Sequence, residues 1–153
     1  MVASKKKVNQ TKQPKSNYIN QGGNPNQYYS KFPSWQFLNC DKEYWSISSK
    51  ECRNYFWNEV FPFLQNLETR TWGEILIHAK KHNHNILVDD LNKKARDRLA
   101  LLHIEAEALI SLRVTATHRI YGYITNAVFN ILWIDFNHGD NLTCVCRSVK
   151  KHT

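Results

Sequence analysis

Three features that would assign this sequence to a common class are missing. No run of about 18 apolar residues exists, so we expect no membrane-spanning helix. The motifs GxxxxGKS/T, HExxH and GxSxG are also absent, which argues against P-loop nucleotide hydrolysis, zincin chemistry and the common serine hydrolase. The lysines near the start are followed by polar residues instead of the apolar core of a signal peptide, so we expect a cytoplasmic location.

Cysteine is scarce, with four residues in a chain of 153: Cys40, Cys52, Cys144 and Cys146. They could form two disulfides in an oxidising compartment, but the lack of an export signal favours four reduced thiols. One residue separates Cys144 from Cys146, which is the wrong spacing for a zinc knuckle. We therefore expect no metal site and no other cofactor.

Acidic residues are missing from the first 33 residues, which contain six lysines. This segment carries most of the +8 net charge and leaves about +2 for the remainder. It is rich in Asn, Gln and Lys, so we expect residues 1–32 to be a disordered basic tail. A flexible polycation concentrates near nucleic acid by releasing counterions, although a solubilising extension would have the same composition. The folded domain should then span residues 34–148, followed by a short basic end at 149–153.

Apolar residues make up 42% of the chain, and its length is enough for one domain with a core. A first strand is expected around Trp35. Apolar residues recur every three or four positions over about 50–66, which predicts an amphipathic helix that Pro62 should kink or shorten. Thr71 and Glu74 have the spacing of a capping box and predict the start of a second helix.

The second helix should run to about Lys81 and end in a polar loop at residues 82–85. A third helix should begin after Asp89 and Asp90, because carboxylates favour a helix N-terminus. Its apolar face carries Leu91, Ala95, Leu99 and Leu102.

After residue 107 the apolar residues alternate instead of following a helical period. Strands are expected at about 110–114, 119–124 and 128–136, and the last of them is apolar on nearly both faces. The connections are so short that the strands must be antiparallel neighbours. The predicted fold class is therefore α+β: an N-terminal strand, helices, then a C-terminal three-stranded antiparallel meander.

Alternation places Arg119, Tyr121 and Tyr123 on one face of the middle strand and its isoleucines on the other. Arg113 on the preceding strand faces away from the core, because its neighbours in sequence are core candidates. Two guanidinium groups and two phenol rings could bind phosphate and stack on bases. An exposed sheet face also needs polar residues, and Arg opposite Tyr is an ordinary cross-strand pair, so both interpretations stay open.

His138 follows the last strand, within reach of the two arginines, and could act as a general acid or base near neutral pH. A histidine in a loop can equally be a solvated surface residue. Lys80 and Lys81 lie at a helix end, where cations complement the helix dipole. We include these lysines with the two tyrosines as candidate substrate-binding residues.

The C-terminal half of the sequence contains a Leu-Arg pair ending at Arg113, an Arg-Ile-Tyr-Gly run at 119–122, and Trp-Ile-Asp-Phe-Asn-His at 133–138. This pattern, over about residues 109–138, resembles the ParE-like toxins of the RelE/ParE superfamily of bacterial toxins. In that family an Arg-(Ile/Val)-x-Gly run, a short turn and an apolar strand ending in WxDxxH follow one another. Over residues 34–108 the agreement is in the order of the elements.

The resemblance implies a curved sheet flanked by helices, a cognate antitoxin and, in RelE-type members, ribosome-associated cleavage of mRNA without a metal. On that analogy Arg113 and Arg119 would bind phosphate, His138 would transfer a proton, and Tyr121 or Tyr123 would stack or assist. ParE-type members instead inhibit DNA gyrase. A non-catalytic gyrase inhibitor or nucleic-acid-binding module is therefore the alternative, and an inactive remnant kept for binding a partner is a third hypothesis.

Overall fold

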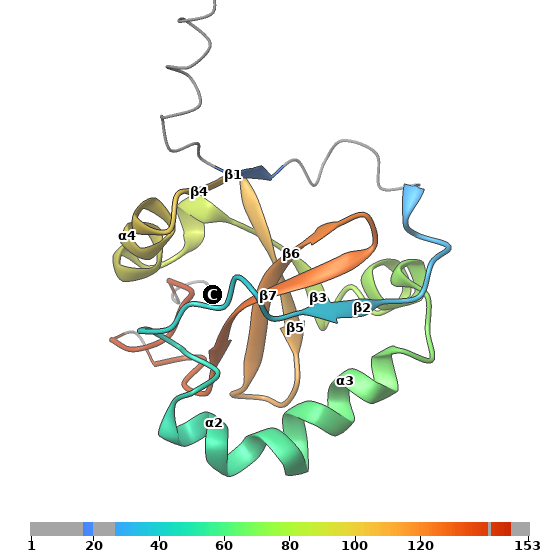
Figure 1. Ribbon diagram of the computed structural model, residues 1–153, viewed down its shortest axis with the longest axis horizontal. Coiled ribbons are helices and arrows are strands. Elements are labelled where there is room, and N and C mark those ends of the chain that lie inside the picture. The colour runs from blue at the N-terminus through green and yellow to red at the C-terminus, as the bar shows by residue number, and fades with distance from the viewer. Residues whose placement is uncertain (1–16, 20–26, 141, 148–153) are drawn as a thin grey trace, which may run out of the picture.

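The computed structural model of the protein describes residues 17–19, 27–140 and 142–147 (Figure 1). Its centre is a mixed sheet with the strand order β2-β7-β6-β5-β3. The strands of this sheet are β2 (Ser34–Gln36), β3 (Asn83–Leu87), β5 (Ala108–Arg113), β6 (Arg119–Thr125) and β7 (Val128–Asp135).

The predicted antiparallel meander forms the middle of this sheet. Strands β5, β6 and β7 are antiparallel neighbours, and the turn between the last two contains Asn126 and Ala127. Both turn residues have positive φ angles, 52° and 69°, which is the backbone conformation of a two-residue hairpin turn that matches the twist of the strands. The sheet is nevertheless more than a simple meander, since β2 adds to β7 in parallel and β3 adds to β5 in antiparallel.

The pairing of β6 with β7 shifts register in the middle of the strands. Gly122 pairs with Ile131, whereas Tyr121 pairs with Trp133, so Leu132 is an extra residue on β7. A bulge of this kind changes the direction of the side chains that follow it. Leu132 and Trp133 consequently both belong to the same buried cluster.

The first long helical segment is continuous through Pro62. It consists of α2 (Lys50–Tyr55), the π-helical η2 (Phe56–Val60) and α3 (Phe61–Leu67). The side chain of Ser49 caps its start by accepting from the backbone N–H of Cys52 at 3.0 Å. Pro62 lies in the first turn of α3, directly after the widened π-helical turn, where a missing backbone N–H is tolerated.

The second helix is shorter than predicted. It is the π-helical η3 (Glu74–His78), which ends before Lys81. The predicted capping box is confirmed: the backbone N–H of Thr71 donates to the Glu74 carboxylate at 2.9 Å, and the N–H of Glu74 donates to the Thr71 hydroxyl at 3.2 Å.

The prediction of a polar loop at residues 82–85 is wrong, because Asn83, His84 and Asn85 belong to strand β3. The strand lies at the edge of the sheet and leaves three of its five side chains in solvent. Its two apolar residues, Ile86 and Leu87, are adjacent instead of alternating, so its sequence lacks the pattern that predicts a strand. Asn83 is the exception: it is buried, donates to the carbonyl oxygen of Ile75, and accepts from the backbone N–H of Arg113.

The third helix is confirmed, with its apolar face. The 3₁₀ turn η4 (Val88–Asp90) leads into α4 (Lys93–Leu101), and Leu91, Ala95 and Leu99 are buried. Within the described part of the chain, no helix is long and apolar enough to cross a membrane.

Two short segments from the predicted tail are described. β1 (Asn17–Ile19) pairs in parallel with β4 (Ile104–Ala106), and Tyr29 accepts a backbone hydrogen bond from Gly73 at 2.9 Å. Parts of the chain before residue 33 therefore belong to the folded domain. The rest of the predicted tail, residues 1–16 and 20–26, lies outside the described residues, and so does the predicted basic end at 149–153.

The two faces of the sheet are covered by different helices (Figure 1). Side chains of α2, η2, α3 and η3 pack on one face, which we call the α2–α3 face. On the other, the α4 face, α4 and a C-terminal segment that includes Val145 cover the sheet. The α2–α3 face buries mainly aliphatic residues with Trp72 and Phe129, whereas the α4 face also buries Tyr121, Tyr123 and Trp133.

Candidate functional site

The predicted catalytic residues meet at the end of the sheet that carries the β5–β6 hairpin. Arg113, the last residue of β5, pairs with Arg119, the first residue of β6, and Arg119 pairs with Asp135, the last residue of β7. The backbone N–H of His138 donates to the carbonyl oxygen of Thr117 at 3.0 Å, which holds the loop after β7 beside the hairpin. We call Arg113, Arg119 and His138 the arginine–histidine site.

Arg119 is half-buried and is tied to the hairpin. Its Nη1 donates to the carbonyl oxygens of Thr115, Ala116 and His118, the last two at 3.1 and 3.3 Å. Burial lowers the pKa of Arg119, and the charge of Arg113 acts in the same direction. Among the described residues nothing accepts from Nε or Nη2, so the guanidinium can hold the hairpin and contact an anion at the same time.

Arg113 lies opposite Arg119, and no described acid forms a salt bridge with either arginine, although Asp135 and Cys146 interact electrostatically with Arg119. Within the described residues, the Arg113 guanidinium has no hydrogen bond and no salt bridge. Asp135, which pairs with Arg119 across the sheet, accepts from the backbone N–H groups of Val145 and Asn137, both at 2.8 Å. Like charges directly opposite on neighbouring strands destabilise a sheet, so this arrangement favours an anionic ligand.

His138 contacts sulfur on its inner side. Its Nδ1 lies 3.4 Å from Sγ of Cys146, whose Sγ in turn lies 3.7 Å from that of Cys144. With Nδ1 facing a sulfur, Nε2 is the ring nitrogen that remains for a ligand. Asp135 stands behind this group, and burial raises its pKa against the opposing effect of its two backbone hydrogen bonds.

Tyr121 and Tyr123 do not form the expected exposed face. Their side chains are 0% and 3% exposed, because α4 and the C-terminal segment cover this side of the sheet. The Tyr123 hydroxyl accepts from the side-chain amide of Asn39 at 3.1 Å. Neither ring can stack on a base, so the prediction that they bind substrate in this way is wrong. Strand alternation identifies the shared face of these residues but gives no information about what covers it.

Lys80 and Lys81 are exposed and directly precede β3. Asn83 of β3 pairs with Leu112, the residue before Arg113. The chain carrying the two lysines therefore enters the sheet beside the strand end that carries Arg113, and basic residues continue from β6 across β5 to this edge.

Two residues of this region were missed as site candidates: Cys144 and Cys146. The sequence signal is their close spacing, which was interpreted as unsuitable for a zinc knuckle, with the four cysteines expected to be reduced thiols. Among the residues that the structure describes, no group of three or more His, Cys, Asp or Glu side chains is arranged to hold a metal ion.

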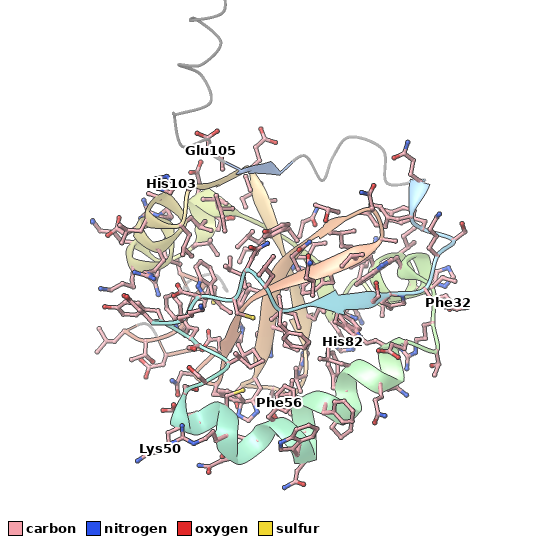
Figure 2. All side chains as sticks on the ribbon, in the orientation of Figure 1. Phe32, Lys50, Phe56, His82, His103 and Glu105 are labelled. Atoms are coloured by element: carbon pink, nitrogen blue, oxygen red, sulfur yellow. The ribbon has the colours of Figure 1, made fainter. Side chains whose placement is uncertain are left out.

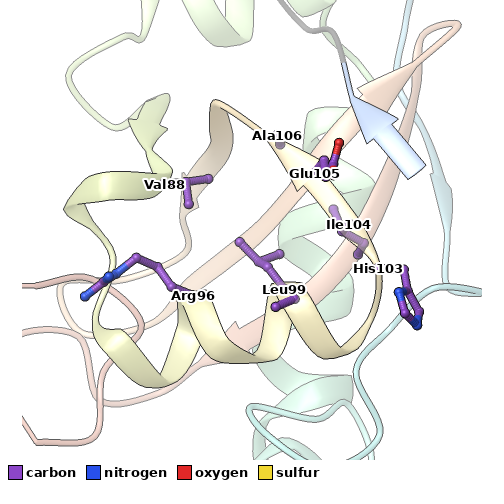
Figure 3. Close-up of a pocket in the computed structure, with 8 residues that line it drawn as sticks. Val88, Arg96, Leu99, His103, Ile104, Glu105 and Ala106 are labelled. Atoms are coloured by element: carbon purple, nitrogen blue, oxygen red, sulfur yellow. The ribbon is translucent and has the colours of Figure 1, made fainter. Parts of the chain in front are cut away.

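A cavity of about 480 Å³ lies beside α4 and β4, away from the arginine–histidine site (Figure 3). Its polar lining residues include Arg96, His103 and Glu105. Their polar ends point in different directions instead of converging on one position (Figure 3). This cavity therefore lacks the convergent polar groups of a small-molecule site.

The β5–β6 hairpin packs against the α2–η2–α3 helix, on the side of the molecule opposite to the cavity. Nδ1 of His118 contacts the Glu59 carboxylate, and its ring centroid lies 4.7 Å from that of Phe136. Figure 2 shows Phe56 on this helix, far from His103, which lines the cavity. The site and the cavity are separate features.

Compared with protein-family models, curated proteins and solved structures, the chain matches none. The function of the arginine–histidine site must therefore be inferred from the arrangement of its residues.

Proposed function

We propose that the protein is the toxin of a type II toxin–antitoxin pair, and that it cleaves ribosome-bound mRNA without a metal ion. The observation that carries this proposal is the meeting of Arg113, Arg119 and His138 at one end of the sheet. They come from β5, from β6 and from the loop after β7. The partners implied are a cognate antitoxin and the translating ribosome.

The pair of arginines, neither of which forms a salt bridge with a described residue, suits a phosphodiester. Arg113 has a guanidinium without a partner among the described residues, and Arg119 keeps two nitrogens available. A guanidinium is planar and remains charged, so it can hold two non-bridging phosphate oxygens. The pair would then stabilise the additional negative charge of a pentacovalent phosphate.

His138 would supply the proton for the leaving group. In this reaction the ribose 2′ oxygen forms a bond to phosphorus and gives its proton to water. The bond from phosphorus to the 5′ oxygen breaks, and Nε2 of protonated His138 donates a proton to that oxygen. Lys80 and Lys81 would hold the RNA backbone on the β3 side of the site.

Substitution of the three residues, together with a distant arginine, tests the proposal. Arg113→Ala is the most informative variant, since its guanidinium makes no hydrogen bond or salt bridge with a described residue and its loss should leave folding intact. We expect RNA cleavage with translating ribosomes to fall about 100-fold or more for Arg113→Ala and for His138→Ala. Arg96→Ala, which removes an exposed arginine from α4, is the matched control and should retain activity.

Growth arrest on induced expression provides a second measurement. The same two variants should relieve the arrest, whereas Arg96→Ala should not. Persistent arrest without new RNA 5′ ends would contradict cleavage and would favour the non-catalytic gyrase or nucleic-acid-binding alternative. Arg119→Ala also removes three contacts to the hairpin, so its interpretation requires a thermal unfolding curve.

A further inference from the structure

The segment after β7 brings two cysteines together behind His138. Sγ of Cys146 lies 3.7 Å from Sγ of Cys144 and 3.4 Å from Nδ1 of His138. The backbone of this segment is fixed, because Cys146 forms an isolated antiparallel bridge with Leu91 and the backbone N–H of Asn92 donates to Val145. The two sulfurs are held close to each other by contacts outside the site.

The surroundings of Cys146 favour its thiolate form. A hydrogen bond from the Cys144 thiol lowers the pKa of Cys146 to about 4 against the opposing effect of burial, and His138 and Tyr121 act in the same direction as that hydrogen bond. The pKa of Cys144 moves the opposite way, since its proton is shared with Cys146 and its side chain is buried. Cys146 is therefore the sulfur that ionises more readily, and Cys144, whose Sγ also donates to the carbonyl oxygen of Cys146 at 2.8 Å, is the one that keeps its proton.

Tyr121 places a buried hydroxyl beside this cluster. Its oxygen makes no hydrogen bond of standard geometry with a described residue, but Ser111 and Cys146 lie close enough to interact with it. Burial raises the pKa of this hydroxyl well above the usual value, so it stays protonated and can donate. An oxygen atom bonded to Sγ of Cys146 would offer this donor an acceptor of better geometry.

The other two cysteines form a natural comparison. Burial raises the pKa of Cys40 and that of Cys52 to about 11, so both remain protonated thiols at neutral pH. Cys40 is nevertheless more exposed than Cys146, which is 8% exposed. Exposure and thiolate character therefore predict opposite orders of reactivity for these two residues.

We propose that Cys146 and Cys144 are an oxidant-reactive dithiol, in which a peroxide oxidises Cys146 and Cys144 then closes a disulfide. The Cys146 thiolate attacks one peroxide oxygen, the oxygen–oxygen bond breaks, and the departing hydroxide takes a proton and leaves as water. This step forms a sulfenic acid on Cys146. Cys144 then loses its proton and attacks that sulfur, the sulfur–oxygen bond breaks, and a second water leaves. In sum, two thiols and one peroxide give one disulfide and two waters.

The closure requires a short movement. The sulfurs must approach from 3.7 Å to the covalent distance of about 2.05 Å, within a segment that has one residue between the two cysteines. Oxidation would remove both the thiolate and the thiol proton beside His138. The thiol chemistry itself does not depend on the proposed cleavage of RNA.

Peptide mass mapping of the reduced full-length protein after hydrogen peroxide tests this proposal. We expect the peptide holding Cys144 and Cys146 to lose two hydrogens, and Cys146 to react at least about tenfold faster than Cys40 at neutral pH. Cys144→Ser should stop at the sulfenic acid, seen as one added oxygen on Cys146. Cys146→Ser should leave Cys144 unoxidised, and Cys40→Ser should change nothing.

Lowering the pH should increase the difference in oxidation rate between Cys146 and Cys40. At pH 6 the thiolate of Cys146 persists, whereas the reactivity of Cys40 should fall about tenfold for each pH unit. Equal rates at Cys40 and Cys146, or a Cys144→Ser variant that still loses two hydrogens at this peptide, would overturn the proposal. Circular dichroism of each variant before oxidation separates chemical reactivity from unfolding.

Discussion

The two faces of the sheet are stabilised in different ways. On the α2–α3 face, the buried cluster contains aliphatic and aromatic residues together with Cys52. On the α4 face, charged and polar groups are buried beside the apolar ones: Asp41 and Asp135 are 0% exposed, Arg98 is 8% exposed, and the Tyr121 hydroxyl is enclosed. Apolar contacts require complementary shape, whereas each buried polar group also requires a partner.

This difference explains why the candidate chemistry gathers on one face. Buried groups with hydrogen-bond partners, such as Asp41, stabilise the packing of the α4 face. Groups without a well-formed hydrogen bond to a described residue, such as the Arg113 guanidinium and the Tyr121 hydroxyl, mark positions where a ligand or modification can be accommodated. The comparison predicts that the effect of a substitution on the α4 face depends on whether the group removed was paired.

The largest effect is expected for the buried ion pair. Asp41 accepts from Nη2 and Nε of Arg98 at 2.8 and 2.9 Å and from Nε1 of Trp133 at 2.9 Å. Asp41→Asn leaves the buried Arg98 with only the exposed carboxylate of Glu43, at 3.3 Å, as a counter-ion, which should lower the free energy of unfolding by about 3 kcal/mol. Urea unfolding measures this change. The control, Asp97→Asn, removes the exposed Lys93–Asp97 pair and should cost less than about 0.5 kcal/mol.

The same residue should make unfolding depend on acid. Burial alone would raise the pKa of Asp41, but the hydrogen bonds from Arg98, Glu43, Trp133 and Tyr44 lower it below the usual value. A carboxyl group whose pKa is lowered in the folded state stabilises the protein above its unfolded pKa, and this contribution is lost as pH falls through the folded pKa. The wild-type protein should therefore lose more stability than Asp41→Asn below about pH 4. Equal acid dependence of the two proteins would contradict this assignment.

An intermediate effect on stability is expected on the α2–α3 face, where the fit between packed atoms determines the cost of a substitution. A Cβ atom on Gly122 would lie 2.1 Å from the carbonyl oxygen of Asn130 and 2.7 Å from the ring of Phe129. Because the first of these atoms is backbone, Gly122→Ala should destabilise the protein by about 2–3 kcal/mol. Gly73→Ala is the matched control: its nearest contact would be 3.0 Å, and a helical φ of −62° suits alanine. A thermal shift of equal size in the two variants would show that the close approach at Gly122 is unimportant.

Sequence periodicity predicted the α2–α3 face better than the α4 face. The antiparallel meander, the Thr71–Glu74 capping box and the apolar side of α4 all follow from local patterns, and the structure contains them. Alternation also placed Ile120 and Ile124 correctly against the helices. Each of these inferences depends on residues within a few positions of one another, or on connections too short to allow another arrangement.

The predictions that were wrong concern contacts between residues distant in sequence. Tyr121 is buried because residues near Val145 and the helix α4 fold over it, and strand alternation carries no information about such coverage. Strand β3 is held by pairing with β5 and begins with three polar residues, so its sequence lacks the alternation that predicts a strand. Arg113, Arg119 and His138 could be placed near one another because a tight hairpin and a strand end bring them together. The cysteine cluster behind His138 could not, since its geometry depends on the bridge between Cys146 and Leu91.

The smallest effect on stability is expected where a buried hydroxyl has no hydrogen bond of good geometry to lose. Tyr121→Phe removes a hydroxyl that only interacts weakly with Ser111 and Cys146, so the free energy of unfolding should change by less than about 0.5 kcal/mol.

Tyr123→Phe is the matched variant on the same strand: it removes a hydroxyl that accepts from Asn39, so it should destabilise by about 1 kcal/mol. Urea unfolding of the two reduced variants measures the difference, and a loss above about 2 kcal/mol for Tyr121→Phe would show that its hydroxyl is well paired in solution. A loss for Tyr123→Phe without one for Tyr121→Phe would show that hydrogen bonding, and not burial, decides what a hydroxyl contributes on the α4 face.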